Sequence, residues 1–259
     1  FLTWAQPLPT IEEKTAGLKK EEGFFTFYRE EAGGKVWLEI RQFDSLFLYL
    51  VSLPAGLGSN DIGLDRGLQD GGRLVKFSRS GRKVLLIQPN TDYRAIQGDQ
   101  AEKRAVEQSF AQSVLWGFTI EAQTKNAVLV ELSDFLLRDA MQVAVRIRKM
   151  QQGNYVLERS RSALYVERIK NFPRNSEFES TLTFVSSDGS AGNFLQAVVP
   201  SAEAFTLRMH HSFIQLPEPG FQPRLFDPRS SFIPLTYFDY TTPVAEPLQQ
   251  YYAIRHRLQ

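Results

Sequence analysis

Residues 73–88 read Arg-Leu-Val-Lys-Phe-Ser-Arg-Ser-Gly-Arg-Lys-Val-Leu-Leu-Ile-Gln. Two runs with β-branched and aromatic residues flank a Ser-Gly turn, a pattern typical of a β-hairpin. The turn is too short for the crossover that parallel strands require, so we expect the two strands to pair antiparallel. This stretch therefore predicts a β-rich fold of mainly antiparallel strands.

The same pattern continues in both directions from this hairpin. Further strands are expected at Phe24–Arg29, Lys35–Ile40, Leu46–Leu53, Val114–Ala122, Ala127–Leu132, Tyr155–Glu158, Ala163–Lys170, Phe178–Ser186, Phe194–Val199 and Ala204–Leu216. In one of them Trp116 and Phe118 alternate with smaller residues, so we expect both rings on one face, anchoring the core.

Helix signals are fewer than strand signals. Thr10 and Glu13 have the spacing of a capping box and predict a helix that runs to about Glu22. Gln100–Ala111 and a segment from Asp134 to about Met150 are also expected to be helical. Strands and helices do not alternate along the chain, so the sequence does not indicate a parallel sheet. The predicted class is therefore α+β, with β-rich, mainly antiparallel sheets and two or three helices.

The composition changes near Pro217. Seven of the 13 prolines lie between Pro217 and Pro247, among many aromatic residues. Proline blocks helix interiors and sheet hydrogen bonds, so residues 217–259 are predicted to form an extended arm. Residues 1–216 then form the main module, with a possible subdomain break near 133–150.

Five charged residues of the arm are candidate contacts: Arg224, Asp227, Arg229, Arg255 and Arg257. Asp227 precedes a proline, which disfavours helix and leaves its carboxylate available to Arg224 or Arg229. A bidentate pair would fix the turn. The alternative is a solvated Asp-Pro turn.

Composition excludes several classes of protein. The 259 residues carry 30 Lys+Arg and 29 Asp+Glu, and this net charge of +1 argues against a dedicated nucleic-acid binder. Without cysteine, the chain has no disulfide, thiolate zinc site or cysteine nucleophile. This fits a periplasmic or secreted protein, as well as many cytosolic ones. No apolar run approaches the roughly 18–20 residues of a membrane span. Because the chain starts at Phe1, we expect a segment of a longer protein with a leader removed.

The loop of residues 54–72 holds six of the 17 glycines and is long for a compact domain, which suggests a function or a partner contact. Its candidate contact residues are Asn60, Asp61, Asp65 and Arg66. Gly56-Leu-Gly58 starts like a dinucleotide-binding fingerprint, but Asp61 stands at the third glycine position. The loop is either a ligand site or an ordered structural loop whose aspartates bond neighbouring amides.

Two other motifs have simpler explanations. Ser80-Gly-Arg-Lys83 matches the Ser-x-x-Lys of penicillin-recognising acylases, but it lies between two strands and is expected to be a hairpin turn. His210 and His211 are adjacent on an expected strand, so their side chains face opposite ways and do not easily share a metal. We therefore predict no catalytic and no metal-binding residue in this chain, and no stoichiometric zinc.

Several runs resemble one known family. They are Gly23-Phe-Phe-Thr-Phe-Tyr28, Lys35-Val-Trp-Leu-Glu-Ile40, Gly58-Ser-Asn-Asp-Ile-Gly-Leu-Asp-Arg-Gly67, Lys83-Val-Leu-Leu-Ile-Gln-Pro-Asn90, Glu107-Gln-Ser-Phe-Ala-Gln-Ser-Val-Leu-Trp-Gly-Phe118, Pro223-Arg-Leu-Phe-Asp-Pro-Arg229 and Arg255-His-Arg-Leu258. The family is the N-terminal region, a domain of unknown function, of large bacterial zinc-dependent metalloproteases of the metzincin type. The chain departs from the family at Ser230-Ser231-Phe232, where glycine and an aromatic residue are expected, and at His256, where an aromatic residue is expected.

The resemblance implies a non-catalytic N-terminal module of a periplasmic or secreted zinc metalloprotease. Such a module supports the folding, inhibition or substrate access of a downstream catalytic domain, which carries the zinc. Its partners are that domain and, as a possibility, a protein or peptide substrate; no nucleic acid and no membrane span are expected. The rival hypothesis is a free-standing binding domain that uses the loop of residues 54–72 for a glycan, ion or protein. A third is an independent enzyme with carboxylate chemistry.

Overall fold

A computed structural model describes residues 7–254, which fall into two compact units. Unit 1 holds residues 7–86 and 116–216, and unit 2 holds residues 87–115 and 217–254. The chain thus leaves unit 1 after its first sheet strands, returns to it, and leaves it again at Pro217. We describe each unit by itself.

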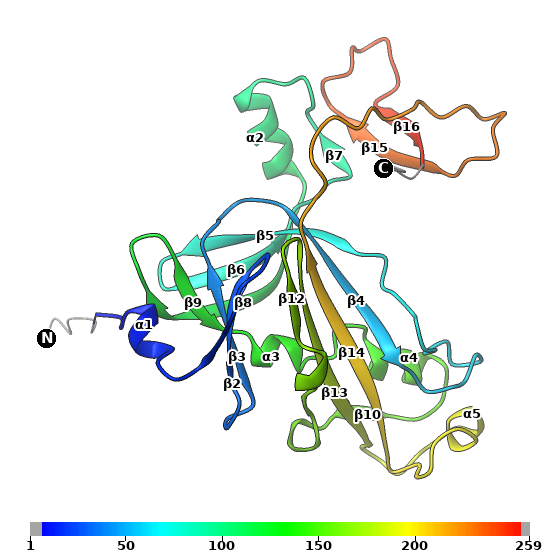
Figure 1. Cartoon of the computed structure of the whole chain (residues 1–259). Helices are drawn as coiled ribbons and strands as arrows, with labels where there is room; N and C mark the ends of the chain where they lie inside the picture. Colours follow the sequence, from blue (N-terminus) through cyan, green and yellow to red (C-terminus); the bar gives the residue numbers. More distant parts are fainter. Residues whose placement is uncertain (1–6, 255–259) are drawn as a thin grey trace, which may run out of the picture. The chain divides into compact units, whose positions relative to one another are not determined.

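Unit 1 is built on one curved, mostly antiparallel sheet with the strand order β1-β2-β3-β9-β8-β6-β5-β4-β14-β13-β10 (Figure 1). The strands are β1 (Lys19–Glu21), β2 (Thr26–Glu30), β3 (Lys35–Ile40), β4 (Phe47–Ala55), β5 (Arg73–Ser80), β6 (Lys83–Gln88), β8 (Ser113–Gln123), β9 (Val128–Glu131), β10 (Tyr155–Leu157), β13 (Asn175–Ser186) and β14 (Ala204–Ile214). Two short strands, β11 (Ala163–Leu164) and β12 (Lys170–Phe172), also pair with β13. The predicted hairpin at residues 73–88 is confirmed as β5 and β6, with Gly81 at φ 60° in the turn.

The predicted α+β class is wrong, because the helices are too short to form a layer of their own. The α-helices are α1 (Ile11–Lys14), α2 (Gln100–Ser109), α3 (Ser133–Leu136), α4 (Val143–Lys149) and α5 (Asn193–Gln196), with 3₁₀ turns η1 (Arg159–Arg161) and η2 (Val166–Arg168). The chain is instead a mainly β protein, as its strand-rich pattern indicates. Among residues 7–254, no helix is both long and apolar enough to cross a membrane.

Three predicted elements differ from the structure for local reasons. The capping box of Thr10 and Glu13 is confirmed, but α1 ends after one turn, and Gly17 at φ 80° then directs the chain into β1. The predicted helix at 134–150 is divided into α3 and α4 because Gln142 adopts φ 54° and Asp139 caps the amide of Val143. The strand predicted at Phe194–Val199 is helix α5.

The sheet of unit 1 curls until its two ends meet, so it is nearly closed. The amide of Phe24 donates to the carbonyl of Phe172 (2.8 Å), and the side-chain amide of Asn171 donates to the carbonyl of Phe25 (2.8 Å). The amide of Phe25 donates to the hydroxyl of Ser176 (3.1 Å), which itself donates to Asn171 (2.7 Å). We call this junction between residues 23–25 and 171–176 the seam.

The core of unit 1 is rich in aromatic rings. Its largest fully buried side chains include Phe27, Tyr49, Phe77, Phe135, Phe178, Phe184 and Phe213. Strands that bury alternate residues bring six of these rings together from β2, β4, β5, β13 and β14, and α3 contributes Phe135. Phe118 joins this core as predicted, whereas Trp116 is only half-buried and contacts Phe135, with ring centroids 5.9 Å apart.

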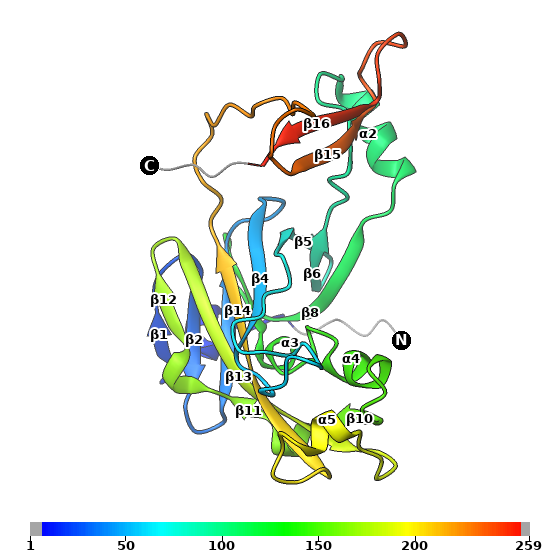
Figure 2. The same cartoon turned by 90° about the vertical axis from the view of Figure 1, so that its right-hand side faces the viewer.

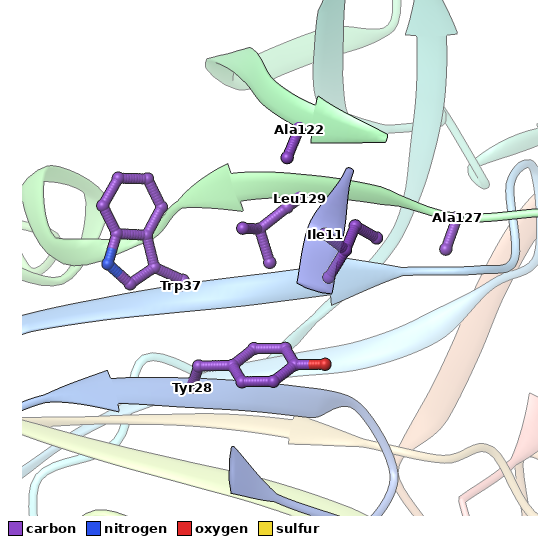
Figure 3. Close-up of a cluster of buried hydrophobic side chains, with 6 residues drawn as sticks. All are labelled: Ile11, Tyr28, Trp37, Ala122, Ala127 and Leu129. Carbon is purple, nitrogen blue, oxygen red and sulfur yellow. The ribbon is translucent and has the colours of Figure 1, made fainter. Parts of the chain in front are cut away.

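A second, smaller cluster covers the outer face of the sheet (Figure 3). It consists of Ile11, Tyr28, Trp37, Ala122, Ala127 and Leu129, with Leu18 packed against it. Ile11 comes from α1, so the single helical turn serves to close this face. The ammonium of Lys14 lies 4.7 Å from the centroid of the Trp37 ring and completes the cover.

Unit 2 contains a three-stranded sheet and helix α2 (Figure 2). Its order is β16 (Gln249–Ala253), β15 (Pro234–Asp239) and β7 (Tyr93–Arg94). The Tyr93 ring of β7 stacks on Phe110, which follows α2, with ring centroids 3.6 Å apart, and on Phe238 of β15, with ring centroids 5.4 Å apart. It thereby connects β7, α2 and β15. The predicted extended arm is therefore corrected, because residues 234–253 contain an antiparallel hairpin.

Candidate functional site

A cavity of about 290 Å³ opens in unit 1 beside the seam. It is lined by residues 23–26, by Glu39 near the end of β3, by residues 41–42 and 45–46 of the following connection, by Phe47 at the start of β4, and by Gln215 after β14. We call it the seam pocket. These segments are distant in sequence, and the closure of the sheet brings them together.

Three phenylalanine rings form the floor of the seam pocket. Phe24 lies 4.5 Å from Phe25 and 6.2 Å from Phe47 between ring centroids, and Phe25 lies 5.2 Å from Phe47. The rings meet at 60–71°, so they make a concave cup rather than a flat face. Phe25 and Phe47 also contact Phe77 and Phe213 of the core, which holds the cup in place without a ligand.

The polar wall of the pocket is a neutral ion pair. The buried carboxylate of Glu39 accepts from Nε of Arg41 (2.7 Å) and from the hydroxyl of Tyr28 (2.8 Å). Burial and the hydrogen bond to Glu39 raise the pKa of Tyr28 to about 12, so Tyr28 remains a donor at neutral pH. Since Glu39 and Arg41 compensate each other, this wall has no net charge.

The loop of residues 54–72 folds back on itself through backbone hydrogen bonds. Leu57 donates to Leu64 (2.9 Å), and Gly67 donates to Leu53 (2.7 Å). A Cβ added to Gly56 would lie 2.3 Å from the carbonyl oxygen of Leu64. Close packing therefore explains this glycine without a bound phosphate.

The loop presents the predicted contact residues mainly to solvent. Asn60, Asp61 and Arg66 are exposed, and Asp65 is half-buried. Within the described ranges none of these four side chains makes a hydrogen bond or an ion pair, so the bonds to neighbouring amides considered for Asp61 and Asp65 are absent. They do not converge on one ligand position.

Asp70, which the sequence did not single out, is the carboxylate that holds the loop. It accepts from the amides of Val51 and Gly72 (3.2 Å each) and pairs with Arg73 (2.5 Å). Arg146 of α4 donates to the carbonyl of Gly63 from the other side. The loop is thus fixed to the sheet and to α4.

Of the two candidate partners in the arm, the structure places Arg229 against Asp227. Asp227 accepts from Nε (3.0 Å), Nη2 (2.7 Å) and the backbone amide (2.9 Å) of Arg229. The pair fixes a turn. Because it is exposed, it contributes little to stability. The carbonyl of Arg224 accepts from Ala253 and extends the β16 edge. Arg255 and Arg257 lie outside the described residues.

His210 and His211 face opposite sides of β14, as predicted. His210 Nε2 lies 2.6 Å from Glu177, and Nδ1 lies 3.4 Å from Glu179. Burial alone would lower the pKa of His210, but the two carboxylates raise it overall. His211 points into the core toward Tyr49. In the part of the chain that the structure describes, no three His, Asp or Glu side chains converge as metal ligands do.

The hydrogen bonds of His211 define its tautomer. Nε2 lies 3.1 Å from the carbonyl of Leu136, which only accepts, so Nε2 carries the proton. Nδ1 then accepts from the hydroxyl of Tyr49 (2.8 Å), which accepts from Arg138 (2.8 Å). Burial lowers the pKa of His211 well below its usual value and raises that of Tyr49 to about 12. The network is complete and holds α3 against the sheet.

Sequence reasoning missed the seam pocket. Phe24, Phe25 and Arg41 stand in ordinary strand and turn patterns, and their pocket depends on a contact with residues about 150 positions away. The run Gly23-Phe-Phe was quoted for the resemblance, and Gly23 has a structural reason. A Cβ there would lie 2.3 Å from the Asn171 side chain across the seam.

Comparisons with known proteins give one family. The family described as a domain of unknown function (DUF5117) matches residues 67–259. No curated protein and no solved structure shows a significant match to the chain. The family description names no activity. The family match covers most of the chain, and the protein therefore belongs to the DUF5117 family.

Proposed function

We propose that this chain is a non-catalytic N-terminal module of a zinc-dependent metalloprotease of the metzincin type, and that it supports folding, inhibition or substrate access of the catalytic domain. The runs that resemble such proteins support the proposal, and four of the seven lie wholly within the residues of the family match. The zinc belongs to the catalytic domain in this proposal. The chain is periplasmic or secreted, and its partners are that domain and a protein or peptide substrate.

The observation that carries the proposal is the apolar face of the β15–β16 hairpin. Ile233, Leu235 and Ile254 are 72%, 52% and 47% exposed. Ile254 pairs with Ile233 and Leu235 lies opposite Tyr252, so the strand register places the three apolar side chains on one face. Soluble proteins seldom leave such groups uncovered. The catalytic domain is the proposed cover.

The first test separates the chain from its proposed partner. The chain of 259 residues is expected to hydrolyse no casein and to retain no zinc after dialysis. The longer protein is expected to contain one zinc and to lose its activity with a chelator. A coding sequence without a His-Glu-x-x-His motif after Gln259, or one tight zinc in the isolated chain that is lost in His210→Ala, contradicts the proposal.

The second test addresses the apolar face. In the longer protein, Leu235→Ser is expected to lower the folded yield or the peptidase activity at least threefold, because it weakens the covered face. Val156→Ser changes an equally exposed residue of unit 1 (51%) and serves as the matched control. Equal effects of the two substitutions contradict a specific contact at β15–β16.

The second candidate is a free-standing binding domain. Its support is the fixed loop of residues 54–72, which presents Asn60, Asp61 and Arg66 to solvent. A stop codon directly after Gln259 favours it over the metalloprotease module. If the chain still binds its glycan, ion or protein ligand after Asn60→Ala and Asp61→Ala are combined, the binding-domain hypothesis is contradicted.

A further inference from the structure

We propose that the seam pocket binds one neutral apolar side chain of a peptide, aromatic or large aliphatic, together with the peptide groups beside it. The proposal rests on the shape, the charge and the free hydrogen-bonding groups of the pocket. It does not depend on the metalloprotease proposal.

The volume and shape of the pocket select a side chain. A cavity of about 290 Å³ is at the lower end of the range for small-molecule sites. It suits one residue and its flanking peptide groups better than a larger ligand. The tilted rings of Phe24, Phe25 and Phe47 enclose an apolar group from several sides. The 60–71° tilts between the rings leave no broad flat platform of the kind on which a sugar stacks.

The charges of the pocket select a neutral group. Glu39 and Arg41 are the charged residues of the lining, and they neutralise each other at 2.7 Å. A charged side chain that entered the cup would lose its hydration and gain no counter-charge. Neutral aromatic and aliphatic side chains lose little by entering and bury apolar surface.

The rim provides partners for the peptide backbone. Gln42, Ser45 and Gln215 line the opening and are exposed. Within residues 7–254 their side chains make no hydrogen bond, so amide and hydroxyl groups are available. Peptide N–H and C=O groups need both donors and acceptors, which glutamine and serine supply. The chemistry of the rim therefore matches a peptide as well as the floor does.

The test measures binding of capped amino acids to the chain by ligand-observed NMR. The probes are the N-acetyl amides of phenylalanine, leucine, alanine, lysine and aspartate, with methyl glucoside as the sugar. Phenylalanine and leucine amides are expected to bind with Kd on the order of 1 mM, as befits such small ligands. The other four probes are expected to bind at least tenfold more weakly. Equal or tighter binding of a charged probe or of the sugar overturns the proposal.

Variants locate the binding at the seam pocket. Phe24→Ser opens the cup, and Ser45→Trp fills it from an exposed position where folding is not at risk. Each is expected to weaken binding of phenylalanine amide at least tenfold. Phe194→Ser changes an exposed phenylalanine of α5 outside the pocket and is expected to leave binding unchanged. Unchanged binding in Ser45→Trp, with circular dichroism of the native fold, overturns the assignment.

A charge variant tests the neutral wall. Arg41 is 63% exposed in its side chain, so Arg41→Gln is expected to fold and to leave Glu39 without its counter-charge. Binding of lysine amide is then expected to rise at least threefold, and binding of aspartate amide is expected not to rise. No change in the lysine probe contradicts the role of the Glu39–Arg41 pair.

Discussion

Unit 1 buries most of its large apolar side chains, whereas unit 2 exposes many of them. Unit 1 closes a long sheet around a core of aromatic rings, and seven of its large hydrophobic side chains are exposed among the described residues. Unit 2 is much smaller but exposes twelve: Ile96, Val114, Phe221, Leu225, Phe232, Ile233, Leu235, Tyr240, Val244, Leu248, Tyr251 and Ile254. Its helix α2 buries no residue.

The difference teaches which part of the chain is self-sufficient. A closed sheet has both its backbone groups and its apolar face satisfied internally, and the seam of unit 1 achieves this with Asn171 and Ser176. Three short strands cannot bury two faces. Unit 2 therefore leaves apolar side chains exposed, and the proposed catalytic domain would cover them.

The largest expected effect comes from the core of unit 1. Phe213 is fully buried and contacts six other rings, so Phe213→Ala is expected to cost about 3–5 kcal/mol of unfolding free energy. Urea unfolding followed by tryptophan fluorescence measures it, because Trp37 and Trp116 both lie in unit 1.

The matched substitution in unit 2 is Phe232→Ala. Phe232 is 43% exposed, so the loss is expected to be within about 0.5 kcal/mol. If Phe213→Ala and Phe232→Ala lower the free energy of unfolding by similar amounts, the proposed difference between the two units is contradicted.

The seam gives an intermediate effect. Gly23→Ala places a Cβ 2.3 Å from Asn171 and 2.7 Å from the carbonyl of Phe172, and is expected to cost about 1–3 kcal/mol through strain. In the control Gly117→Ala, the added Cβ has its nearest neighbour, Leu85, at an ordinary 3.6 Å. The control is expected to be neutral or slightly stabilising in the same urea titration. A neutral Gly23→Ala would mean that the seam is not a tight contact.

The smallest effect concerns the two adjacent histidines. The pKa of His210 is raised in the folded state, so its ion pairs stabilise fully below the unfolded value near 6.5 and are lost as pH rises through the folded value. The pKa of His211 is lowered in the folded state, so its contribution to stability is present above the unfolded value near 6.5 and is lost as the pH falls through the folded value. His210→Gln should therefore cost more stability at pH 5.5 than at pH 8.5, by less than about 1 kcal/mol. Equal costs at the two pH values contradict the pairing with Glu177 and Glu179.

Local signals in the sequence predicted local structure well. The Ser80-Gly81 turn, the capping box at Thr10 and the opposite faces of His210 and His211 each depend on neighbours within a few positions. The helix at 134–150 was overestimated because nothing local shows that Gln142 takes a left-handed conformation. The helices among residues 7–254 are short and form no layer of their own, so the class is β rather than α+β.

The candidate site was harder to predict than the elements. The seam pocket needs the contact of residues 23–25 with 171–176, and no local pattern encodes that contact. The loop of residues 54–72 was noted for its length and its glycines, but the residue that holds it is Asp70, whose partners Val51 and Arg73 lie on two different strands. The Asp227–Arg229 pair was predictable because it spans two residues.

Hydrogen exchange of the backbone amides tests the central claim most directly. Mass spectrometry compares the chain of 259 residues with the longer protein that the proposed function requires. The strands of unit 1 are expected to be equally protected in both, whereas β15 and β16 are expected to gain at least tenfold protection in the longer protein. Equal exchange of β15 and β16 in the two proteins would contradict the account, because unit 2 would then need no cover.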